Sequence, residues 1–388
     1  MQKREIVGRS VFDDRPIRIE YNKSGIIAIT DISEEKDLPC ISPGFFDMQV
    51  NGYYGVDYSL KDLKAEHVRA LVDHLAVAGT TCHVPTFVSM PHEQLLKNLQ
   101  VTCSAMKSDE IVGAAILGFH VEGPFISPIE GPRGVHDPKY IRAADTRLFD
   151  EWQEAAEGRI AYLTVAPETE GALDFIRYVV GQGVKVAIGH SGASPEQIRE
   201  AIDAGATIST HLGNGSYVMI PRLRNYIWEQ LAADELFAGM ICDGYHLPAA
   251  VVKVFARAKG LDRLFLVSDA ALLGGYDPGV YKWGDLDIDV HEDGHLGLHG
   301  TSVLAGAGHL LDWDIAKFME FTGNSLVDTI KLCTINPAKN LGFDTSPYLS
   351  FKVGGEANFS VFSYERGEER LNIVRTVMSG VDVYKAKG

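Results

Sequence analysis

The sequence predicts an α/β fold in which a (β/α)8 TIM-type barrel carries a small β-sandwich domain formed by both termini. The first observation is length, because 388 residues suit one large barrel with an accessory domain. The second is that short apolar segments alternate eight times with longer helical patterns. The third is that polar side chains follow nearly every apolar segment, and barrel active sites lie at such strand ends. A doubly wound open sheet shares the alternation but would gather these residues at one switch point.

The candidate barrel strands are short apolar segments that each end in polar residues. In chain order they end at Phe45–Gln49, Cys82–Thr86, Phe119–Glu122, Leu163–Pro167, Val186–His190, Ile208–His211, Met240–Asp243 and Phe265–Asp269. The segments between them have helical patterns, as in Leu63–Val77, Pro91–Met106, Pro195–Ala204 and Pro248–Ala258. Proline near the beginning of such a segment, as at Pro195, is a helix start signal. We therefore assign residues 43–342 to the barrel.

Both ends of the chain have a different pattern, with short β-like runs. These runs are Pro16–Tyr21, Gly25–Asp31, Asn358–Tyr364 and Ile373–Tyr384. We expect residues 1–42 and 343–388 to form the β-sandwich together. A further insert, Val280–Leu298, has the pattern of one or two hairpins, with a turn at Glu292-Asp293-Gly294.

Composition excludes several classes of protein. The formal net charge is −16, whereas nucleic-acid binders need a basic face to replace phosphate counterions. A small anionic substrate remains compatible, because a local site can oppose the global sign. No segment has the length needed to span a bilayer, and Met1–Arg9 lacks the apolar run of a signal peptide. Five scattered cysteines without a Cys-x-x-Cys motif indicate a reducing cytoplasm rather than a disulfide scaffold.

Histidines and carboxylates at the predicted strand ends form a candidate metal site. Glu122, His190 and His211 end the third, fifth and sixth strands, and Asp269 ends the eighth. One carboxylate and two imidazoles with a fourth position open is the ligand pattern of a catalytic zinc site. A metal on these three residues would polarise a carbonyl and lower the pKa of a water molecule. Asp269 is then the base that takes the water proton and later donates it to the leaving amine.

The alternative for each residue alone is structural. A single strand-end histidine is more often a hydrogen-bonded structural residue than a ligand, and a single buried aspartate more often belongs to a loop or cap. The set at five strand ends favours function, because chance rarely aligns so many. We expect structural or solvated roles for the remaining histidines outside the motifs, which are His67, His74, His83, His92, His291, His295, His299 and His309.

Several motifs together carry a resemblance that runs over most of the chain. They are Pro43 to Gly52 (PGFFDMQVNG), His120 to Phe125 (HVEGPF), Gly134-Val135-His136, Gly189-His190-Ser191, Thr210-His211-Leu212, Asp243-Gly244-Tyr245-His246, Ser268-Asp269-Ala270, Leu304-Ala305-Gly306 and Asn336-Pro337-Ala338. In order and spacing they resemble the N-acetylglucosamine-6-phosphate deacetylases of the amidohydrolase superfamily. The resemblance implies the same barrel, terminal sandwich, metal ligands and acid/base. It also implies that His136 helps to polarise the acetyl carbonyl and that His246 contacts the sugar phosphate region.

The metal count follows from the first strand. Many amidohydrolases carry His-x-His there and hold two metals, whereas this chain has Gln49-Val50-Asn51. An amide is a poorer ligand for a transition metal than an imidazole. We therefore expect one divalent metal ion per subunit, zinc in preference to iron or another divalent ion, and we expect Gln49 and Asn51 to line the substrate site.

The chain departs from the family pattern in the segment that resembles its phosphate-contacting part. The usual Thr-His-Leu-x-Asn-Ala-Met is replaced by a sequence in which Asn214 is followed by Gly215 and Ser216. Arg222 lies at the expected distance after His211 and suits phosphate geometry, although a surface role is equally compatible. We expect Asn214, Gly215, Arg222 and His246 to bind the substrate.

Other functions remain open at this point. The same chemistry could act on an unphosphorylated or epimeric N-acetyl hexosamine, or on an N-acyl amino acid. A non-catalytic binding barrel would require loss of a ligand or of the base, and all are present. A deaminase is disfavoured by Gln49 and Asn51. The resemblance implies a small amino-sugar substrate and a homodimer. The acidic charge and the lack of a spanning segment predict no nucleic-acid and no membrane partner.

Overall fold

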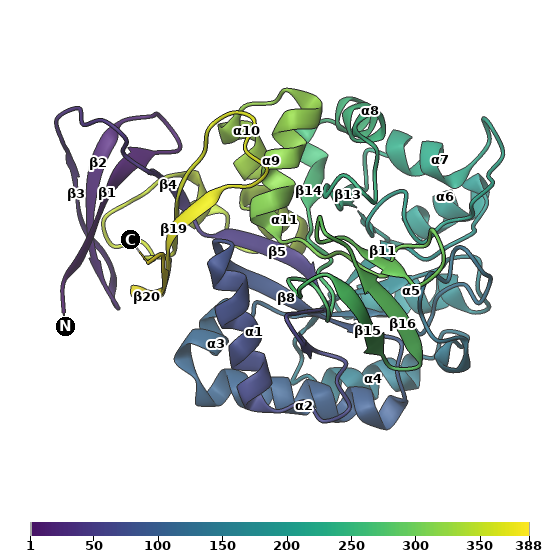
Figure 1. The fold of residues 1–388 in the computed structure, drawn as a ribbon. Coiled ribbons are helices and arrows are strands. Elements are labelled where there is room, and N and C mark those ends of the chain that lie inside the picture. The colour runs from purple at the N-terminus through teal and green to yellow at the C-terminus, as the bar shows by residue number, and fades with distance from the viewer. Residues whose placement is uncertain (1, 388) are drawn as a thin grey trace.

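The computed structural model describes residues 2–387 and has a barrel beside a separate sheet that both termini build (Figure 1). The order of strands in the barrel sheet is β14-β13-β12-β11-β10-β9-β8-β5, with every neighbouring pair parallel. A bridge between Val50 and Ala270 links the two ends of this order, so the sheet is nearly closed. The (β/α)8 prediction is confirmed.

All eight predicted barrel strands are present. They are β5 (Phe45–Val50), β8 (Thr80–Val88), β9 (Phe119–Glu122), β10 (Ile160–Val165), β11 (Lys185–Ile188), β12 (Ile208–Ser209), β13 (Phe237–Met240) and β14 (Leu264–Leu266). Every residue of β5 and β9 is buried, as expected for parallel strands covered on both faces. Phe46, Met48, Ala187 and Ile208, from the barrel strands β5, β11 and β12, belong to one buried apolar cluster.

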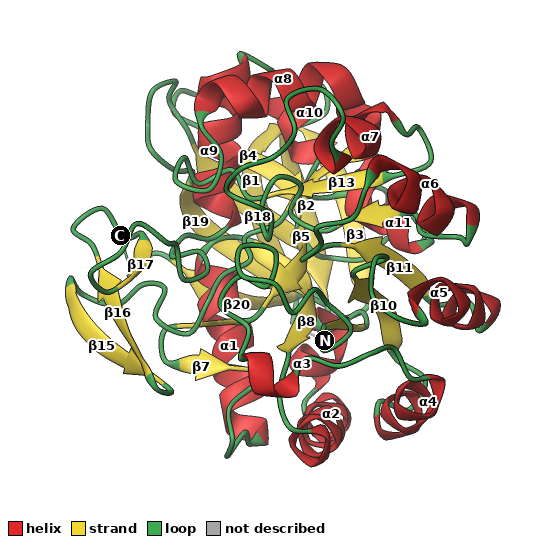
Figure 2. Ribbon diagram, turned by 90° about the vertical axis from the view of Figure 1, so that its right-hand side faces the viewer, coloured by secondary structure: helices red, strands yellow, loops and turns green. Residues whose placement is uncertain are grey.

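Helices surround this sheet on its outer side (Figure 2). They are α1 (Ala65–Val77), α2 (His92–Ser108), α3 (Glu110–Ala115), α4 (Thr146–Ala155), α5 (Ala172–Gly181), α6 (Pro195–Asp203), α7 (Tyr226–Ala232), α8 (Ala249–Lys259), α9 (Leu311–Thr322), α10 (Leu326–Lys331), α11 (Ile335–Leu341) and α12 (Ser346–Leu349), with 3-10 turns at Pro138–Tyr140 and Leu261–Arg263. No helix within residues 2–387 is long and apolar enough to cross a membrane.

The terminal sheet has the order β20-β19-β18-β4-β1-β2-β3. Its strands are β1 (Arg4–Ser10), β2 (Pro16–Asn22), β3 (Gly25–Asp31), β4 (Cys40–Pro43), β18 (Phe359–Ser363), β19 (Asn372–Met378) and β20 (Val381–Lys385). The pairing of β4 with β1 on one side and β18 on the other joins the two ends of the chain. The domain boundaries at residues 42 and 343 stay predictions.

Two smaller sheets lie close to the strand ends. The strands β6 (Gly52–Tyr53) and β7 (Val56–Asp57) follow β5 directly. The insert contains β15 (Gly279–Trp283), β16 (Leu286–Val290) and β17 (Leu296–Leu298), and a turn between β16 and β17 falls at the predicted place. This insert forms an antiparallel sheet beside the barrel (Figure 2).

Candidate metal centre and active site

The predicted site residues lie at or just beyond the carboxyl ends of the barrel strands. Gln49 and Glu122 belong to β5 and β9, whereas His190, His211 and Asp269 follow β11, β12 and β14 by two or three residues. All five side chains belong to buried residues, with 2 to 8% of their surface exposed. Parallel strands therefore bring residues more than two hundred positions apart, such as Gln49 and Asp269, into hydrogen-bonding contact.

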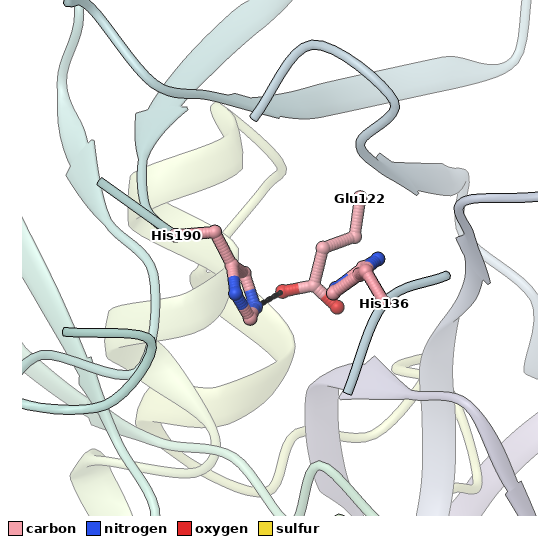
Figure 3. Close-up of side chains that lie close together, drawn as sticks. All are labelled: Glu122, His136 and His190. Carbon is pink, nitrogen blue, oxygen red and sulfur yellow. Dashed lines mark ion pairs between the residues drawn. The ribbon is translucent and has the colours of Figure 1, made fainter. Parts of the chain in front are cut away.

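Glu122, His190 and His211 form a tight triangle of donor atoms. The Oε1 atom of Glu122 lies 3.4 Å from His190 Nε2 and 3.2 Å from His211 Nε2, and the two Nε2 atoms lie 3.1 Å apart. His136 comes close as well: one donor atom each from Glu122, His136 and His190 lies within 4.8 Å of the others. Figure 3 shows these three side chains converging.

The triangle fits a metal ion. Tetrahedral ligands at about 2.0–2.1 Å from zinc are about 3.3–3.4 Å from one another, which is close to the three distances above. His190 Nδ1 lies 2.9 Å from the Pro132 carbonyl oxygen, to which it donates in the tautomer that leaves Nε2 free as a ligand. No hydrogen-bond partner within residues 2–387 contacts the buried Nδ1 of His211.

Electrostatics favour an ionised carboxylate in the centre. Burial opposes ionisation of Glu122, but hydrogen bonds and charge from His190 and His211 outweigh it and hold the pKa of Glu122 well below its ordinary value. Burial opposes protonation of His211, but the hydrogen bond and the charge of Glu122 outweigh it and raise the pKa of His211 above its ordinary value. Burial and the nearby His190 lower the pKa of His136 to about 3, so this imidazole is neutral at pH 7.

Asp269 is fixed by the two amides of the first strand. Gln49 Nε2 donates to Asp269 Oδ1 at 3.0 Å and to Glu122 Oε1 at 3.1 Å, while Asn51 Nδ2 donates to the same Asp269 oxygen at 2.7 Å. Burial and the charge of Glu122 raise the pKa of Asp269 to about 6. The structure thus places Gln49 and Asn51 against the carboxylates, a role that the sequence did not predict.

Three site residues have an unusual backbone. His190, His211 and Asp269 have φ values of 49°, 26° and 48°, in the left-handed region that non-glycine residues rarely adopt. Such strain persists where surrounding structure enforces it, and it is common at functional sites. The left-handed turn redirects each side chain as the chain leaves its strand, and no sequence signal reveals it.

Glycines make room for the His190 ring. A Cβ atom on Gly215 would lie 2.8 Å from His190 Nδ1, and one on Gly134 would lie 3.2 Å from His190 Cε1. The backbone at Gly215 also accepts a hydrogen bond from the Ser191 N–H at 3.2 Å. Gly215 therefore packs against a predicted metal ligand, and a side chain at this position would displace it.

The remaining predicted residues are spread around the site. His246 Nδ1 lies 2.7 Å from Asp243 Oδ2, and Asn214 Nδ2 donates to the His211 carbonyl oxygen at 3.2 Å. Asn214 and Gly215 line a small cavity together with His190. Arg222 is exposed before α7 and does not line this cavity.

Sequence reasoning missed several supporting residues. Asp243 holds His246 and also accepts the N–H groups of Tyr245 and His246; its spacing of three from His246 was a usable signal. The Oγ atom of Ser89 lies 2.9 Å from His136 Nδ1. Ser89 follows β8, far from His136 in the sequence, so no local spacing connects the two residues.

Comparisons with known proteins agree with this geometry. Residues 40–383 match the model of the Amidohydrolase family. The chain is similar to the N-acetylglucosamine-6-phosphate deacetylase of Bacillus subtilis, with 31% identity over 83% of this chain and 80% of that protein. It is also similar to the N-acetylgalactosamine-6-phosphate deacetylase of Escherichia coli O157:H7, with 29% identity over 86% of each chain.

A solved structure adds the fold. The N-acetyl-D-glucosamine-6-phosphate deacetylase of Mycobacterium smegmatis, as a mutant in complex with N-acetyl-D-glucosamine-6-phosphate, superposes with a TM-score of 0.85 at 26% identity. The superposition covers 99% of this chain and 100% of that one. The chain therefore belongs to the amidohydrolase family, in the branch that contains the N-acetylglucosamine-6-phosphate deacetylases.

Proposed function

We propose that this enzyme removes the acetyl group from N-acetylglucosamine 6-phosphate, releasing acetate and the amino sugar phosphate. The family establishes a hydrolase that acts on an amide. The observation that carries the proposal is the triangle of Glu122, His190 and His211 with Asp269 bound beside it through Gln49. This arrangement supplies a cation site and a base side by side among buried residues.

Glu122, His190 and His211 are the proposed ligands of a single divalent metal, with zinc as the preferred ion. Such an ion, when bound, polarises the amide carbonyl and makes water more acidic. Gln49 and Asn51 stand on the first strand where many amidohydrolases carry His-x-His. Gln49 donates hydrogen bonds to Asp269 and Glu122, and Asn51 donates one to Asp269. This use of the two amides supports one metal rather than two.

Asp269 is the proposed proton carrier. It accepts a proton from water as the water oxygen attacks the acetyl carbon. It then passes that proton to the nitrogen as the C–N bond breaks, so that the amine leaves and acetate forms. Both amides donate to Oδ1, which leaves Oδ2 as the oxygen that exchanges the proton.

His136 is proposed to donate a hydrogen bond to the acetyl carbonyl. A neutral imidazole has one donor nitrogen and one acceptor nitrogen. Ser89 Oγ lies at His136 Nδ1, and Nε2 is then the nitrogen available to the substrate.

The sugar phosphate is proposed to lie near His246, Asn214, Gly215 and Arg222. The Asp243 carboxylate fixes the ring of His246, and an arginine can grip two phosphate oxygens at once. Arg222 is exposed on its loop, so its contact with phosphate is the part that most needs a test.

A rate comparison tests the phosphate half of the proposal. We expect kcat/KM to be much higher for N-acetylglucosamine 6-phosphate than for N-acetylglucosamine, and Arg222→Ala to raise KM for the phosphorylated sugar only. Arg224→Ala, a change two residues away at an exposed arginine that pairs with Glu196, is the control. Equal kcat/KM for the two sugars would refute the proposed preference for a phosphorylated substrate. It would not contradict the proposed deacylation reaction.

The epimer N-acetylgalactosamine 6-phosphate is the second candidate substrate. It is favoured by the similarity to the Escherichia coli O157:H7 enzyme that carries this name. The same assay with both epimers decides between them by the ratio of kcat/KM.

A homodimer in the cytoplasm completes the proposal. The loop between β12 and α7 exposes 93% of Val218, 88% of Met219 and 76% of Leu223, and large exposed apolar side chains are typical of interaction sites. The five cysteines are free thiols, which suits a reducing compartment. Sedimentation of the unmodified protein and of a Val218→Ser/Met219→Ser variant tests the dimer.

A further inference from the structure

A second cavity lies apart from the residues of the metal site. Its volume is about 780 Å³, within the range of sites that bind small molecules. Its walls are the β6 strand, the end of α1, the first turn of α9, residues 367–371 between β18 and β19, and the start of β19. A backbone hydrogen bond of 3.0 Å from Leu371 to Asp312 fixes this connection to α9, and the connection passes beside α9 in Figure 1.

Asp312 gives this cavity a buried carboxylate. Only 7% of the residue is exposed, and burial raises the pKa of its carboxyl to about 7, with Arg370 and the N–H groups of its own helix turn opposing that shift. Within residues 2–387 it has no ion pair and no hydrogen bond to another side chain. Because burial keeps this carboxyl partly protonated near pH 7, a cationic group in the cavity would favour its ionised form.

The other walls suit a ring that carries hydroxyl groups. Tyr53, Tyr54, Trp313 and Tyr384 line the cavity with aromatic surface. His309 stacks on Trp313 with the ring centres 4.0 Å apart and thereby covers one face of the indole. Aromatic faces attract ammonium groups, and the phenol groups of the tyrosines can exchange hydrogen bonds with hydroxyls.

Charge at the rim selects a cation rather than an anion. Glu368 and Glu369 lie on the rim with a single arginine, Arg370. Together with Asp312 they give three carboxylates to one guanidinium, so the cavity is electronegative. An anionic ligand would meet this excess of negative charge, whereas a small ammonium compound would reduce it.

We propose that this cavity binds a small hydroxylated primary amine of the amino-sugar type, with its ammonium group on Asp312 and its ring against Tyr53. Trp313 also connects the cavity to the active site, because its Nε1 donates to the Asp243 carbonyl at 3.0 Å and Asp243 holds His246. The electronegative rim disfavours a phosphorylated amine, so the ligand of this cavity differs from the phosphorylated product of the proposed deacetylation, and its binding does not rest on that reaction.

Calorimetric titration with glucosamine tests the proposal, with N-acetylglucosamine and glucose as neutral comparisons. We expect glucosamine to bind at least tenfold more tightly than either neutral sugar. Asp312→Asn should weaken glucosamine binding at least tenfold, whereas Asp262→Asn, the same change at an exposed aspartate outside the cavity, should not. Asp269→Asn should keep the affinity, because the active site is not the site measured.

The opposite results would overturn the proposal. Equal affinity for glucosamine and N-acetylglucosamine would remove the ammonium selectivity, and loss of binding in Asp269→Asn with retention in Asp312→Asn would place the ligand in the active site. Circular dichroism checks that Asp312→Asn is folded. Should it not fold, Glu369→Gln and Tyr53→Leu are each expected to weaken binding about threefold, and unchanged affinity in both would contradict the proposal.

Discussion

At the scale of single residues, two amides and a glutamate surround Asp269. Gln49 donates to both Asp269 and Glu122, and Asn51 donates to Asp269 alone. These bonds fix the carboxylate beside the triangle of donor atoms and favour its ionised form, while burial and Glu122 oppose ionisation. A base with a pKa close to the working pH suits proton transfer.

Replacing the base Asp269 should reduce turnover without removing the metal. We expect Asp269→Asn to retain its metal while turnover falls by about two to four orders of magnitude. In the unmodified enzyme, kcat/KM should decrease as the pH falls through about 6, because protonation of Asp269 removes the base. The residual activity of Asp269→Asn should lack this decrease. Near-normal turnover in the variant would mean that another residue accepts the proton.

A second carboxylate makes stability depend on pH. Burial raises the pKa of Asp57 to about 7, and its Oδ2 atom is buried without a hydrogen-bond partner in the described chain. Because the folded state holds this proton more tightly than the unfolded state, Asp57 destabilises the fold increasingly as the pH rises from about 4 to 7.

Unfolding in urea measures this effect. The free energy of unfolding of Asp57→Asn relative to the unmodified protein should rise by about 1–3 kcal/mol between pH 5 and pH 8. Asp262→Asn, at an exposed position, serves as the control and should change little. A difference that is independent of pH at position 57 would contradict the raised pKa.

The residues of the site were predictable to an unequal extent. Glu122, His190, His211 and Asp269 could be named because each ends an apolar strand, and the ends of parallel strands meet. His136 lies on a loop, so it was found through the family resemblance alone. The cavity around Asp312 is lined by residues from distant parts of the chain, from Tyr53 to Tyr384. No local sequence pattern predicts that these residues come together.

At the scale of elements, α6 is the next element after β11, the strand that precedes His190. Ser194 caps this helix: its side chain accepts the Gln197 N–H, and the Gln197 side chain accepts the Ser194 N–H in return. Pro195 follows at the first helical position. The capping box and proline explain why the sequence predicts the start of this helix correctly.

Loss of this cap should cost stability. Ser194→Ala is expected to lower the free energy of unfolding by about 1 kcal/mol, because helix N–H groups lose their acceptor. Ser104→Ala, at an exposed position inside α2, is the matched control and should be neutral or slightly stabilising, since alanine favours helix interiors. Equal midpoints in urea for Ser194→Ala and the unmodified protein would contradict the importance of the cap.

The terminal strands were less predictable than the barrel. The strand β1 was missed because Arg4, Glu5 and Arg9 interrupt its apolar pattern, and its burial depends on pairing with β2 and β4. The single run predicted from residue 373 to 384 is divided into β19 and β20 by a turn at Ser379 and Gly380, both with positive φ. Pairing between distant segments decides such cases, and a local pattern does not contain it.

At the scale of the whole molecule, the barrel brings the proposed metal ligands together from separate strands. The buried charge of their carboxylate then needs a positive charge beside it. The buried Glu122 lies among imidazoles that a metal would hold in place. Ligands of the folded state stabilise it by mass action. The metal is therefore expected to support both activity and thermal stability.

Metal removal tests this coupling. Treatment with a chelator should abolish deacetylation and lower the melting temperature, and added zinc should restore both. The Asp269→Asn variant should show the same change in melting temperature without regaining activity. A melting temperature that is insensitive to chelation, with activity retained, would contradict a metal-dependent mechanism.

The most direct test of the central claim measures metal content and acetate release in the same protein samples. Elemental analysis of the unmodified enzyme should find about one divalent metal per chain, and the enzyme should release acetate from N-acetylglucosamine 6-phosphate. His299→Ala, at an exposed histidine of the insert, should retain both properties, whereas His190→Ala should lose both. Full metal content in a folded His190→Ala protein would contradict the proposed metal centre.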